Sequence, residues 1–322
     1  MPLFDLPLAE LETYRPEIDE PEDFDDFWRR TLAEARAHDL TLQVEPVPTP
    51  LNQLEVFDVT FAGFDGQPVR AWYTRPAGVS ADLPVVVSYI GYSGGRGLPW
   101  DHTLFPSAGY AFLRVDSRGQ GWAQGHPGDT ADPVGHTPAV PGVMTRGLES
   151  PDTYYYRRMF TDAARAVDAV REIPGIARDA VVVSGGSQGG GICIAAAALV
   201  PDVAGLLPDV PFLQHFRRAV DLTAANPYAE ITTYLSTYRT TVEQTWRTLS
   251  YFDGVNLAAR GRAPSLWSVA LMDMVCPPST VYASYNRYGG EKEMEIYPYN
   301  GHEGGASYQV GRQLEWLAAR FG

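Results

Sequence analysis

The stretch from Val181 to Ala198 constrains the fold of this chain more than any other. A run of valines leads into Gly185-Gly186-Ser187-Gln188-Gly189, and an alanine-rich, helix-like segment follows. These five residues fit the pattern G-x-S-x-G, in which a sharp strand-to-helix turn holds a serine in a strained conformation. Glycines two places either side of the serine let strand and helix cross closely, because glycine has no Cβ. The pattern predicts a nucleophile at Ser187; a plain turn with an incidental serine is the alternative.

Composition excludes several classes of partner. The chain has 322 residues, of which 45% are hydrophobic and 20% charged, and its net charge is -14. A protein that binds nucleic acid or an anionic membrane surface needs a basic face, so neither is expected as a partner. No segment approaches the roughly 20 apolar residues that a membrane-spanning helix needs. The first 20 residues carry acids and prolines rather than the basic and apolar segments of a signal peptide, which predicts a cytoplasmic protein.

The chain contains two cysteines, Cys193 and Cys276. Cys193 lies on the helix predicted after the Ser187 turn and should be buried, so two free thiols are expected rather than a disulfide. No CxxC pair or Cys/His ligand cluster occurs in the sequence, and a zinc site therefore has no support.

Strand-like and helix-like segments alternate along the chain, which predicts an α/β fold with a doubly wound, mostly parallel sheet. Asp65-Gly66 predicts a hairpin between the first two strands and makes the sheet mixed. The expected strands are 54–61, 69–74, 84–90, 112–115, 180–183, 204–207, 266–271 and 294–297. The expected helices of the sheet region are 160–173, 189–199, 279–288 and 307–321.

Two regions lie outside this alternation. Residues 1–40 predict an extended, proline-rich arm followed by a helix, with Phe24, Phe27, Trp28 and Leu32 on a core-facing side. Residues from about 212 to 262 show helical patches and no clear strand, and an insertion of this length predicts a helical cap over the site. No repeat or linker divides the sequence, so residues 1–322 are expected to form one domain.

A serine hydroxyl needs a base, and histidine is the usual one at neutral pH. The candidates are His38, His102, His126, His136, His215 and His302. His302 follows the last predicted strand, so its loop can reach the carboxyl edge of the sheet where open α/β sheets bind ligands. Asp273 follows the strand before it and predicts the acid, in the order serine, acid, histidine. Asp209, one strand earlier, is the competing acid; Glu303 is expected to be structural.

An ester-cleaving serine also needs two backbone N–H donors for the oxyanion. The residue after the nucleophile, Gln188, supplies one. The glycine-rich loop Gly91-Tyr92-Ser93-Gly94-Gly95 follows a predicted strand, and the Tyr92 N–H is the candidate for the other. A glycine-rich turn with no catalytic part is the alternative.

With these residues placed, the chain resembles carbohydrate esterase family seven, the acetyl xylan esterase and cephalosporin C deacetylase group of α/β-hydrolases. The resemblance extends over nearly the whole chain. It rests on the triplet Arg118-Gly119-Gln120, the elbow Gly185–Gly189 and the pair His302-Glu303. Weaker family-like stretches are Met144–Gly147, Tyr154–Tyr156, Thr248–Asp253 and Cys276–Thr280.

The resemblance implies a serine esterase that removes acetyl groups from small acetylated sugars, xylo-oligosaccharides and cephalosporin C through an acetyl-enzyme. It implies no metal or organic cofactor, and a homo-hexamer built as a dimer of trimers with its active sites around an inner cavity. Many relatives have His-Gly-Tyr where this chain has Ile90-Gly91-Tyr92, so the oxyanion loop is expected to be supported differently. Arg118, Gly119 and Gln120 are expected to brace the structure, since the triad is complete without them. Another small-ester or lactone hydrolase, or a peptidase, on the same triad is the alternative.

Overall fold

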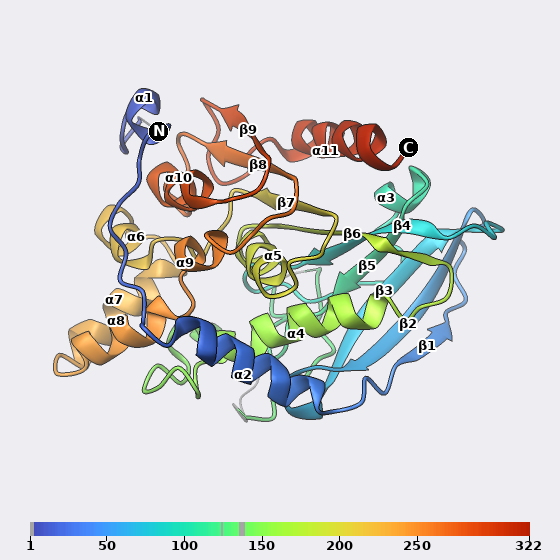
Figure 1. The fold of residues 1–322 in the computed structure, drawn as a ribbon, viewed down its shortest axis with the longest axis horizontal. Helices are drawn as coiled ribbons and strands as arrows, with labels where there is room; N and C mark the ends of the chain where they lie inside the picture. Colours follow the sequence, from blue (N-terminus) through green and yellow to red (C-terminus); the bar gives the residue numbers. More distant parts are fainter. Residues whose placement is uncertain (1–2, 124, 135–138) are drawn as a thin grey trace.

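The computed structural model describes residues 3–123, 125–134 and 139–322; the candidate histidine His136 lies outside these ranges. The described residues form a nine-stranded mixed sheet in the order β1-β2-β3-β5-β4-β6-β7-β8-β9 (Figure 1). Its strands are β1 (Gln43–Pro46), β2 (Leu54–Ala62), β3 (Pro68–Pro76), β4 (Leu83–Tyr89), β5 (Ala111–Val115), β6 (Ile176–Gly186), β7 (Gly205–Asp209), β8 (Ser265–Ala270) and β9 (Lys292–Tyr297).

The sheet divides into an antiparallel and a parallel part. β1, β2, β3 and β5 pair antiparallel in turn, whereas β5, β4, β6, β7, β8 and β9 run parallel to one another. The carboxyl ends of the parallel strands therefore meet at one edge, and β6 lies in the middle of this edge. Ser187, immediately after β6, is placed where loops from both neighbouring sides can reach it.

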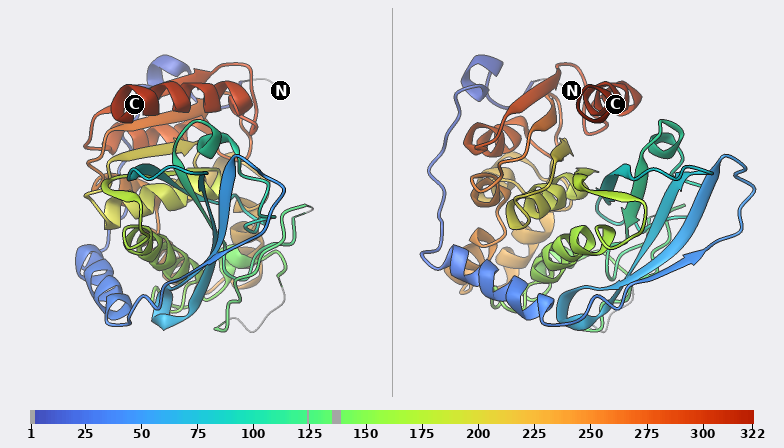
Figure 2. Two further views of the ribbon diagram at one scale, coloured as in Figure 1. Left: turned by 90° about the vertical axis from the view of Figure 1, so that its right-hand side faces the viewer. Right: turned by 45° about the vertical axis from the view of Figure 1, so that its right-hand side comes forward.

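Helices cover both faces of the sheet. They are α1 (Leu8–Leu11), α2 (Phe24–Arg36), α3 (Leu104–Ser107), α4 (Tyr155–Val170), α5 (Gln188–Leu199), α6 (Phe216–Leu222), α7 (Tyr228–Thr237), α8 (Val242–Ser250), α9 (Gly254–Ala258), α10 (Pro278–Arg287) and α11 (Ala306–Phe321). Figure 2 shows α2, α4 and α5 on one side of the sheet and α3 and α11 on the other. None of the helices within the described ranges is long and apolar enough to cross a bilayer.

The alternation of side chains along the central strands explains the two layers. In β4, Val85 and Val87 belong to the large core beneath α4 and α5, whereas Val86 packs with Trp316 and Leu317 of α11. Successive residues of a strand face opposite sides, so a nearly continuous apolar run is buried on both. The valine run of β6 behaves in the same way.

The predicted helix near the N-terminus is α2, and its four apolar residues are buried in the main core. Before it, the chain runs along the outside of the molecule from α1 to α2 (Figure 1). The predicted insertion contains four helices, α6 to α9, between β7 and β8. Asn256 in α9 donates hydrogen bonds to the carbonyl oxygens of Asp19 and Ser250 (both 3.0 Å), so the arm and the insertion are joined by polar contacts.

Several boundaries differ from those expected. The helix predicted to start at Phe160 begins at Tyr155, because Tyr155 and Tyr156 find buried hydrogen-bond partners that their modest helix propensity does not reveal. Strand β1 and helix α7 had no clear pattern in the sequence. Cys193 and Cys276 are free and buried, which confirms the prediction of two thiols.

Candidate active site

Ser187 occupies the sharp turn between β6 and α5. Its backbone has φ 55° and ψ -120°, a left-handed conformation that a residue with a side chain rarely adopts. Two backbone hydrogen bonds hold the turn: Ser187 N–H donates to the Asp209 carbonyl (2.9 Å), and the Ser187 carbonyl accepts from Phe212 N–H (2.9 Å). The chain after β7 thus fixes the strained serine on both sides.

Two glycines of the elbow are required by close approach. A Cβ on Gly185 would lie 2.4 Å from the backbone of Gly189, and a Cβ on Gly189 would lie 2.3 Å from the Tyr89 carbonyl oxygen. At Gly186, a Cβ would come no closer than 4.0 Å to any of its neighbours. The close packing of strand and helix that the pattern predicts therefore falls on Gly185 and Gly189.

Three side chains predicted from the sequence meet at this edge. The His302 Nε2 atom lies 3.0 Å from the Ser187 Oγ, and the His302 Nδ1 atom lies 2.8 Å from the Asp273 Oδ2. The His302 side chain is 33% exposed, whereas Asp273 is completely buried. A hydroxyl, an imidazole and a buried carboxylate in this chain of hydrogen bonds can activate an oxygen nucleophile.

Asp273 owes its orientation to the turn after β8. Its Oδ1 atom accepts from the backbone N–H groups of Val275 (2.8 Å) and Cys276 (2.9 Å), which leaves Oδ2 for His302. Glu303, next to the histidine, points into its own turn and accepts from Asn300 Nδ2 (3.0 Å) and Gly301 N–H (3.2 Å). Short-range contacts therefore hold the carboxylate and the imidazole loop separately.

Asp209, the competing acid, makes a different set of contacts. Its Oδ2 atom accepts from Gln313 Nε2 on α11 (2.8 Å), and Oδ1 has no hydrogen-bond partner within the described residues. Burial raises the pKa of Asp209 to about 7. Asp273, and not Asp209, contacts the imidazole of His302.

The predicted oxyanion donors are the backbone N–H groups of Tyr92 and Gln188. Within the described ranges, neither the Tyr92 N–H nor the Gln188 N–H donates a hydrogen bond to another group. The Gln188 side chain donates to the Ile90 carbonyl (3.1 Å), and Gln120 accepts from the Ser93 N–H (2.8 Å). Gln120 and Gln188 also contact each other (2.9 Å), so the two glutamines hold the oxyanion loop against the elbow.

Comparison with known proteins gives the family. Residues 1–320 match the sequence model of the acetyl xylan esterase (AXE1) family. The chain belongs to this family, whose members are carboxylic ester hydrolases. Its resemblance to acetyl xylan esterases and the predicted α/β-hydrolase fold are thereby confirmed.

Individual relatives agree with the family. An acetyl xylan esterase from Paenibacillus sp. R4 is 40% identical, with a TM-score of 0.92 over 98% of this chain and all of the other. Acetyl xylan esterase 1 from Thermoanaerobacterium sp. JW/SL YS485 is 34% identical, with a TM-score of 0.91 over 99% of this chain and all of the other. Acetyl esterase Axe7A from Xylanibacter ruminicola is 27% identical; the match covers 90% of this chain and 65% of that protein.

The Arg118 triplet of this family member lies in a buried cluster of charges. Arg118 Nε and Nη2 donate to the two carboxylate oxygens of Asp162 (2.6 and 2.8 Å). Asp132 lies 3.7 Å from Arg118 and accepts two hydrogen bonds from Arg158 (3.0 and 2.8 Å). None of the hydrogen bonds that Arg118 makes within the described residues reaches Ser187 or His302.

The helical insertion reaches the predicted oxyanion loop through one side chain that the sequence did not single out. Glu230 of α7 accepts from the Tyr92 hydroxyl (2.5 Å) and from the Gly142 N–H (3.2 Å). Burial and the adjacent carboxylate raise the pKa of Tyr92 above its ordinary value. Tyr92 therefore stays a neutral phenol whose ring is fixed by the insertion.

One group of atoms near Ser187 has the chemistry of a metal site. Potential ligand atoms of Asp273, Cys276 and His302 lie within 4.8 Å of one another, and sulfur, imidazole and carboxylate together suit Zn²⁺. Two of these side chains already share the hydrogen bond described above. A metal held there would compete with the contacts that join His302 to Asp273.

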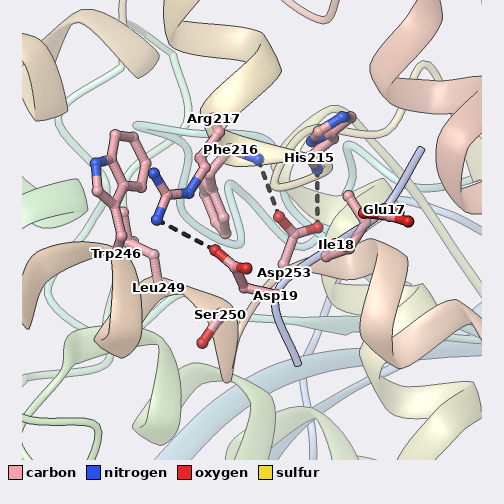
Figure 3. A pocket seen from close by; sticks show the side chains of 10 residues that line it. All are labelled: Glu17, Ile18, Asp19, His215, Phe216, Arg217, Trp246, Leu249, Ser250 and Asp253. Atoms are coloured by element: carbon pink, nitrogen blue, oxygen red, sulfur yellow. Dashed lines mark hydrogen bonds and ion pairs between the residues drawn. The ribbon is translucent and has the colours of Figure 1, made fainter. Parts of the chain in front are cut away.

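Two cavities clarify where a ligand of this esterase can lie. One of about 440 Å³ is bordered by Ser187, His302, Asp209 and the start of α11. Another of about 420 Å³ lies between the N-terminal arm and the insertion (Figure 3). In the second, Arg217 pairs with Asp19 (3.1 Å) and covers Trp246 (4.9 Å), and Asp253 accepts backbone N–H groups. Arg217, Asp19 and Asp253 are thus engaged in contacts within the protein, and the cavity beside Ser187 and His302 is the candidate active site.

Proposed function

We propose that this protein is a serine esterase that removes acetyl groups from small acetylated sugars and xylo-oligosaccharides, and from cephalosporin C. The observation that carries the proposal is the continuous hydrogen-bonded chain from Ser187 through His302 to Asp273. Membership of the acetyl xylan esterase family supports the acyl group and the sugar class. Two similar solved proteins are acetyl xylan esterases, which supports the same substrate.

The first half of the reaction transfers the acetyl group to the enzyme. His302 Nε2 takes the Ser187 proton as Oγ attacks the acetyl carbonyl carbon, and the C=O electrons move onto oxygen. The N–H groups of Tyr92 and Gln188 bind this oxyanion. Asp273 stabilises the imidazolium and holds its tautomer. The tetrahedral intermediate then expels the sugar oxygen, which takes the proton from His302.

The second half frees the enzyme. Water enters, His302 removes one of its protons, and the oxygen attacks the acetyl-enzyme carbonyl. Collapse of the second oxyanion breaks the bond to Ser187 Oγ, which recovers its proton, and acetic acid leaves. The half-exposed imidazole supports both roles, because its Nε2 edge must face the leaving alcohol first and water later.

Selectivity for a small acyl group follows from steric exclusion at the oxyanion loop. The Tyr92 ring packs at 5.6 Å, edge to face, against Trp122 and is held by Glu230. A bulky, fixed ring next to the oxyanion donor leaves little room for a long acyl chain. We propose that acetyl esters are cleaved faster than butyryl esters for this reason.

Three further properties are proposed from the sequence and its resemblance to the family: assembly as a homo-hexamer, a cytoplasmic location, and the absence of any need for a metal or organic cofactor. A hexamer with enclosed active sites would admit oligosaccharides and exclude polymeric xylan. The mass of the particle in solution and a comparison of acetylated xylobiose with polymeric acetyl xylan test this assembly.

The main test replaces the nucleophile. Ser187→Ala should lower the turnover of acetyl esters by several orders of magnitude, in line with the effect of removing a catalytic serine in other hydrolases. A phosphonate that reacts with active serines should label the wild type stoichiometrically and the variant not at all. Retained acetyl-ester hydrolysis by a correctly folded Ser187→Ala protein contradicts the proposal. A panel of acetyl, butyryl, lactone and peptide substrates separates the esterase from a lactonase or peptidase.

A further inference from the structure

A buried carboxylic acid lies beside the elbow and has no part in the proposed mechanism. Asp209 is the last residue of β7, and it is paired in register with Gly186 of β6. Its carbonyl oxygen holds the Ser187 N–H. Its side chain accepts a hydrogen bond from α11, the helix that begins just after the loop of His302.

The contacts on α11 come from two glutamines one turn apart. Gln309 and Gln313 are 2% and 4% exposed, so both face the interior. Gln313 Nε2 donates to Asp209 Oδ2 (2.8 Å), whereas Gln309 Nε2 has no hydrogen-bond partner within the described residues. Gln309 Oε1 in turn accepts from the Tyr297 hydroxyl (2.7 Å).

These four side chains, Asp209, Tyr297, Gln309 and Gln313, form a clasp around the loop 298–305. Tyr297 ends β9 before the loop, and Gln309 lies in the first turn of α11 after it. The two ends of the loop pack closely: a Cβ on Gly305 would lie 2.0 Å from the Tyr297 ring. The clasp therefore ties both ends of the loop to each other and to β7.

We propose that Asp209 is a positioning residue: through Gln313 it holds α11, and with α11 the loop of His302, so that His302 stays at hydrogen-bond distance from Ser187. The inference rests on the proposed function, because it takes His302 as the general base. A base displaced by about 1 Å can lose about 100-fold in rate, so a residue that acts only through the position of the base can still control turnover.

Asparagine and alanine at position 209 separate positioning from other roles. Asparagine keeps the size and one acceptor oxygen of the acid, so it can still receive the Gln313 amide. Alanine removes the anchor and leaves the Gln313 amide buried without its partner. Asp253→Asn is the matched control. Asp253 is also a buried aspartate, and it accepts the backbone N–H groups of His215, Phe216 and Val255, none of which belongs to the His302 loop.

The experiment measures kcat and KM for a soluble acetyl ester, the rate of phosphonate labelling at Ser187, and the downfield proton resonance of the His302–Asp273 hydrogen bond. We expect Asp209→Ala to lower kcat and the labelling rate by 10- to 100-fold, with KM within about twofold, and to shift or broaden the resonance. Asp209→Asn should stay within about threefold of wild type. Asp253→Asn should melt at a lower temperature with an unchanged kcat.

If Asp209→Ala does not fold, Gln313→Ala replaces it, with the same direction and a smaller loss. A kcat within twofold of wild type in a folded Asp209→Ala or Gln313→Ala protein overturns the inference, as does a rise in KM alone or a loss equally large in Asp209→Asn. Failure of the proposed function looks different: the wild type itself would not be labelled at Ser187, or Ser187→Ala would remain active.

Discussion

Two aspartates end neighbouring parallel strands, yet their surroundings give them different properties. Asp273 follows β8, and its carboxylate accepts two backbone N–H groups and the His302 imidazole. Asp209 ends β7, and its carboxylate accepts one amide from Gln313 while Oδ1 lacks a partner within the described residues. Both lie at the edge of the sheet where catalytic residues of this fold are found.

The difference shows that hydrogen-bond donors, more than position at a strand end, decide what a buried carboxyl can do. A carboxylate with several N–H donors can stay charged in the interior and stabilise an imidazolium. One with few donors is costly to ionise, and burial accordingly raises the pKa of Asp209 to about 7. The Asp273 carboxylate can therefore orient the His302 imidazole and stabilise its charged form, whereas the Asp209 carboxyl accepts a hydrogen bond from helix α11.

A third buried aspartate extends the comparison. The Asp162 carboxylate is neutralised by the Arg118 guanidinium through two hydrogen bonds, and a carboxylate oxygen also accepts from the Phe64 N–H (2.8 Å). Here the donor is itself charged and buried. Such a pair adds rigidity where both partners are present and becomes a liability when one is removed.

The largest effect is expected at Asp273. Asp273→Asn keeps the shape of the side chain and removes the charge that holds His302 in its productive tautomer. In the corresponding triad of serine proteases this exchange lowers kcat by about 10⁴-fold. Steady-state kinetics on an acetyl ester, run beside Asp209→Asn, should show that loss only at position 273. Equal losses at the two positions, or a larger one at 209, would reverse the assignment of the acid.

The next largest effect is expected in the free energy of unfolding, and it tests the buried ion pair of Arg118 and Asp162. Arg118→Ala leaves Asp162 buried without its guanidinium, and breaking a buried pair in this way costs about 3–5 kcal/mol. Urea unfolding monitored by circular dichroism measures the change. Activity per folded molecule should fall much less than in Asp273→Asn.

A control decides what the Arg118 result means. The double variant Arg118→Met, Asp162→Leu replaces both charges by apolar groups of similar length and should be more stable than Arg118→Ala. If Arg118→Ala unfolds at the same urea concentration as the wild type, the buried Asp162 carboxylate does not need the Arg118 guanidinium, and the interpretation of this ion pair is wrong.

Much of the site was predictable because its residues carry local signatures. Ser187 lies in a five-residue pattern whose glycines are required by backbone contact, and Asp273 and His302 follow predictable strands in the order that this fold uses. Asp209 and Asp273 both fit that order; the prediction favoured Asp273, and the structure has Asp273 in contact with His302. The fold class followed from the alternation of segments.

Other features depended on contacts between distant parts of the chain. Gln120 and Gln188 meet across 68 residues, and Tyr92 meets Glu230 across 138. No local sequence pattern indicates such pairs, since a glutamine, tyrosine or glutamate can equally well lie on the surface in contact with solvent. Tyr155 belongs to the same class: its helix start is fixed by a hydrogen bond to the Arg118 carbonyl (2.6 Å), a tertiary contact that overrides propensity.

The smallest expected effect sharpens the contrast at Asp209 through pH. The folded protein holds the Asp209 proton with a pKa of about 7, whereas an unfolded aspartate has a pKa of about 3.9. Between these values the folded state binds more protons, so this group contributes stability that is complete below about pH 4 and is lost as pH rises through 7. Asparagine does not titrate and loses nothing over this range.

The melting temperature of Asp209→Asn minus that of the wild type should therefore increase steadily from pH 4.5 to pH 8, whatever its sign at the acidic end. The same difference for Asp273→Asn gives the comparison at the neighbouring strand. Differential scanning calorimetry in buffers of matched ionic strength measures both. A difference for Asp209→Asn that stays constant over this range would mean that the carboxyl remains charged throughout, and one that decreases would mean that the fold favours the charged form. Either result would mean that burial does not keep Asp209 protonated in the folded state, and the contact of Asp273 with the imidazole would remain as the difference between the two aspartates.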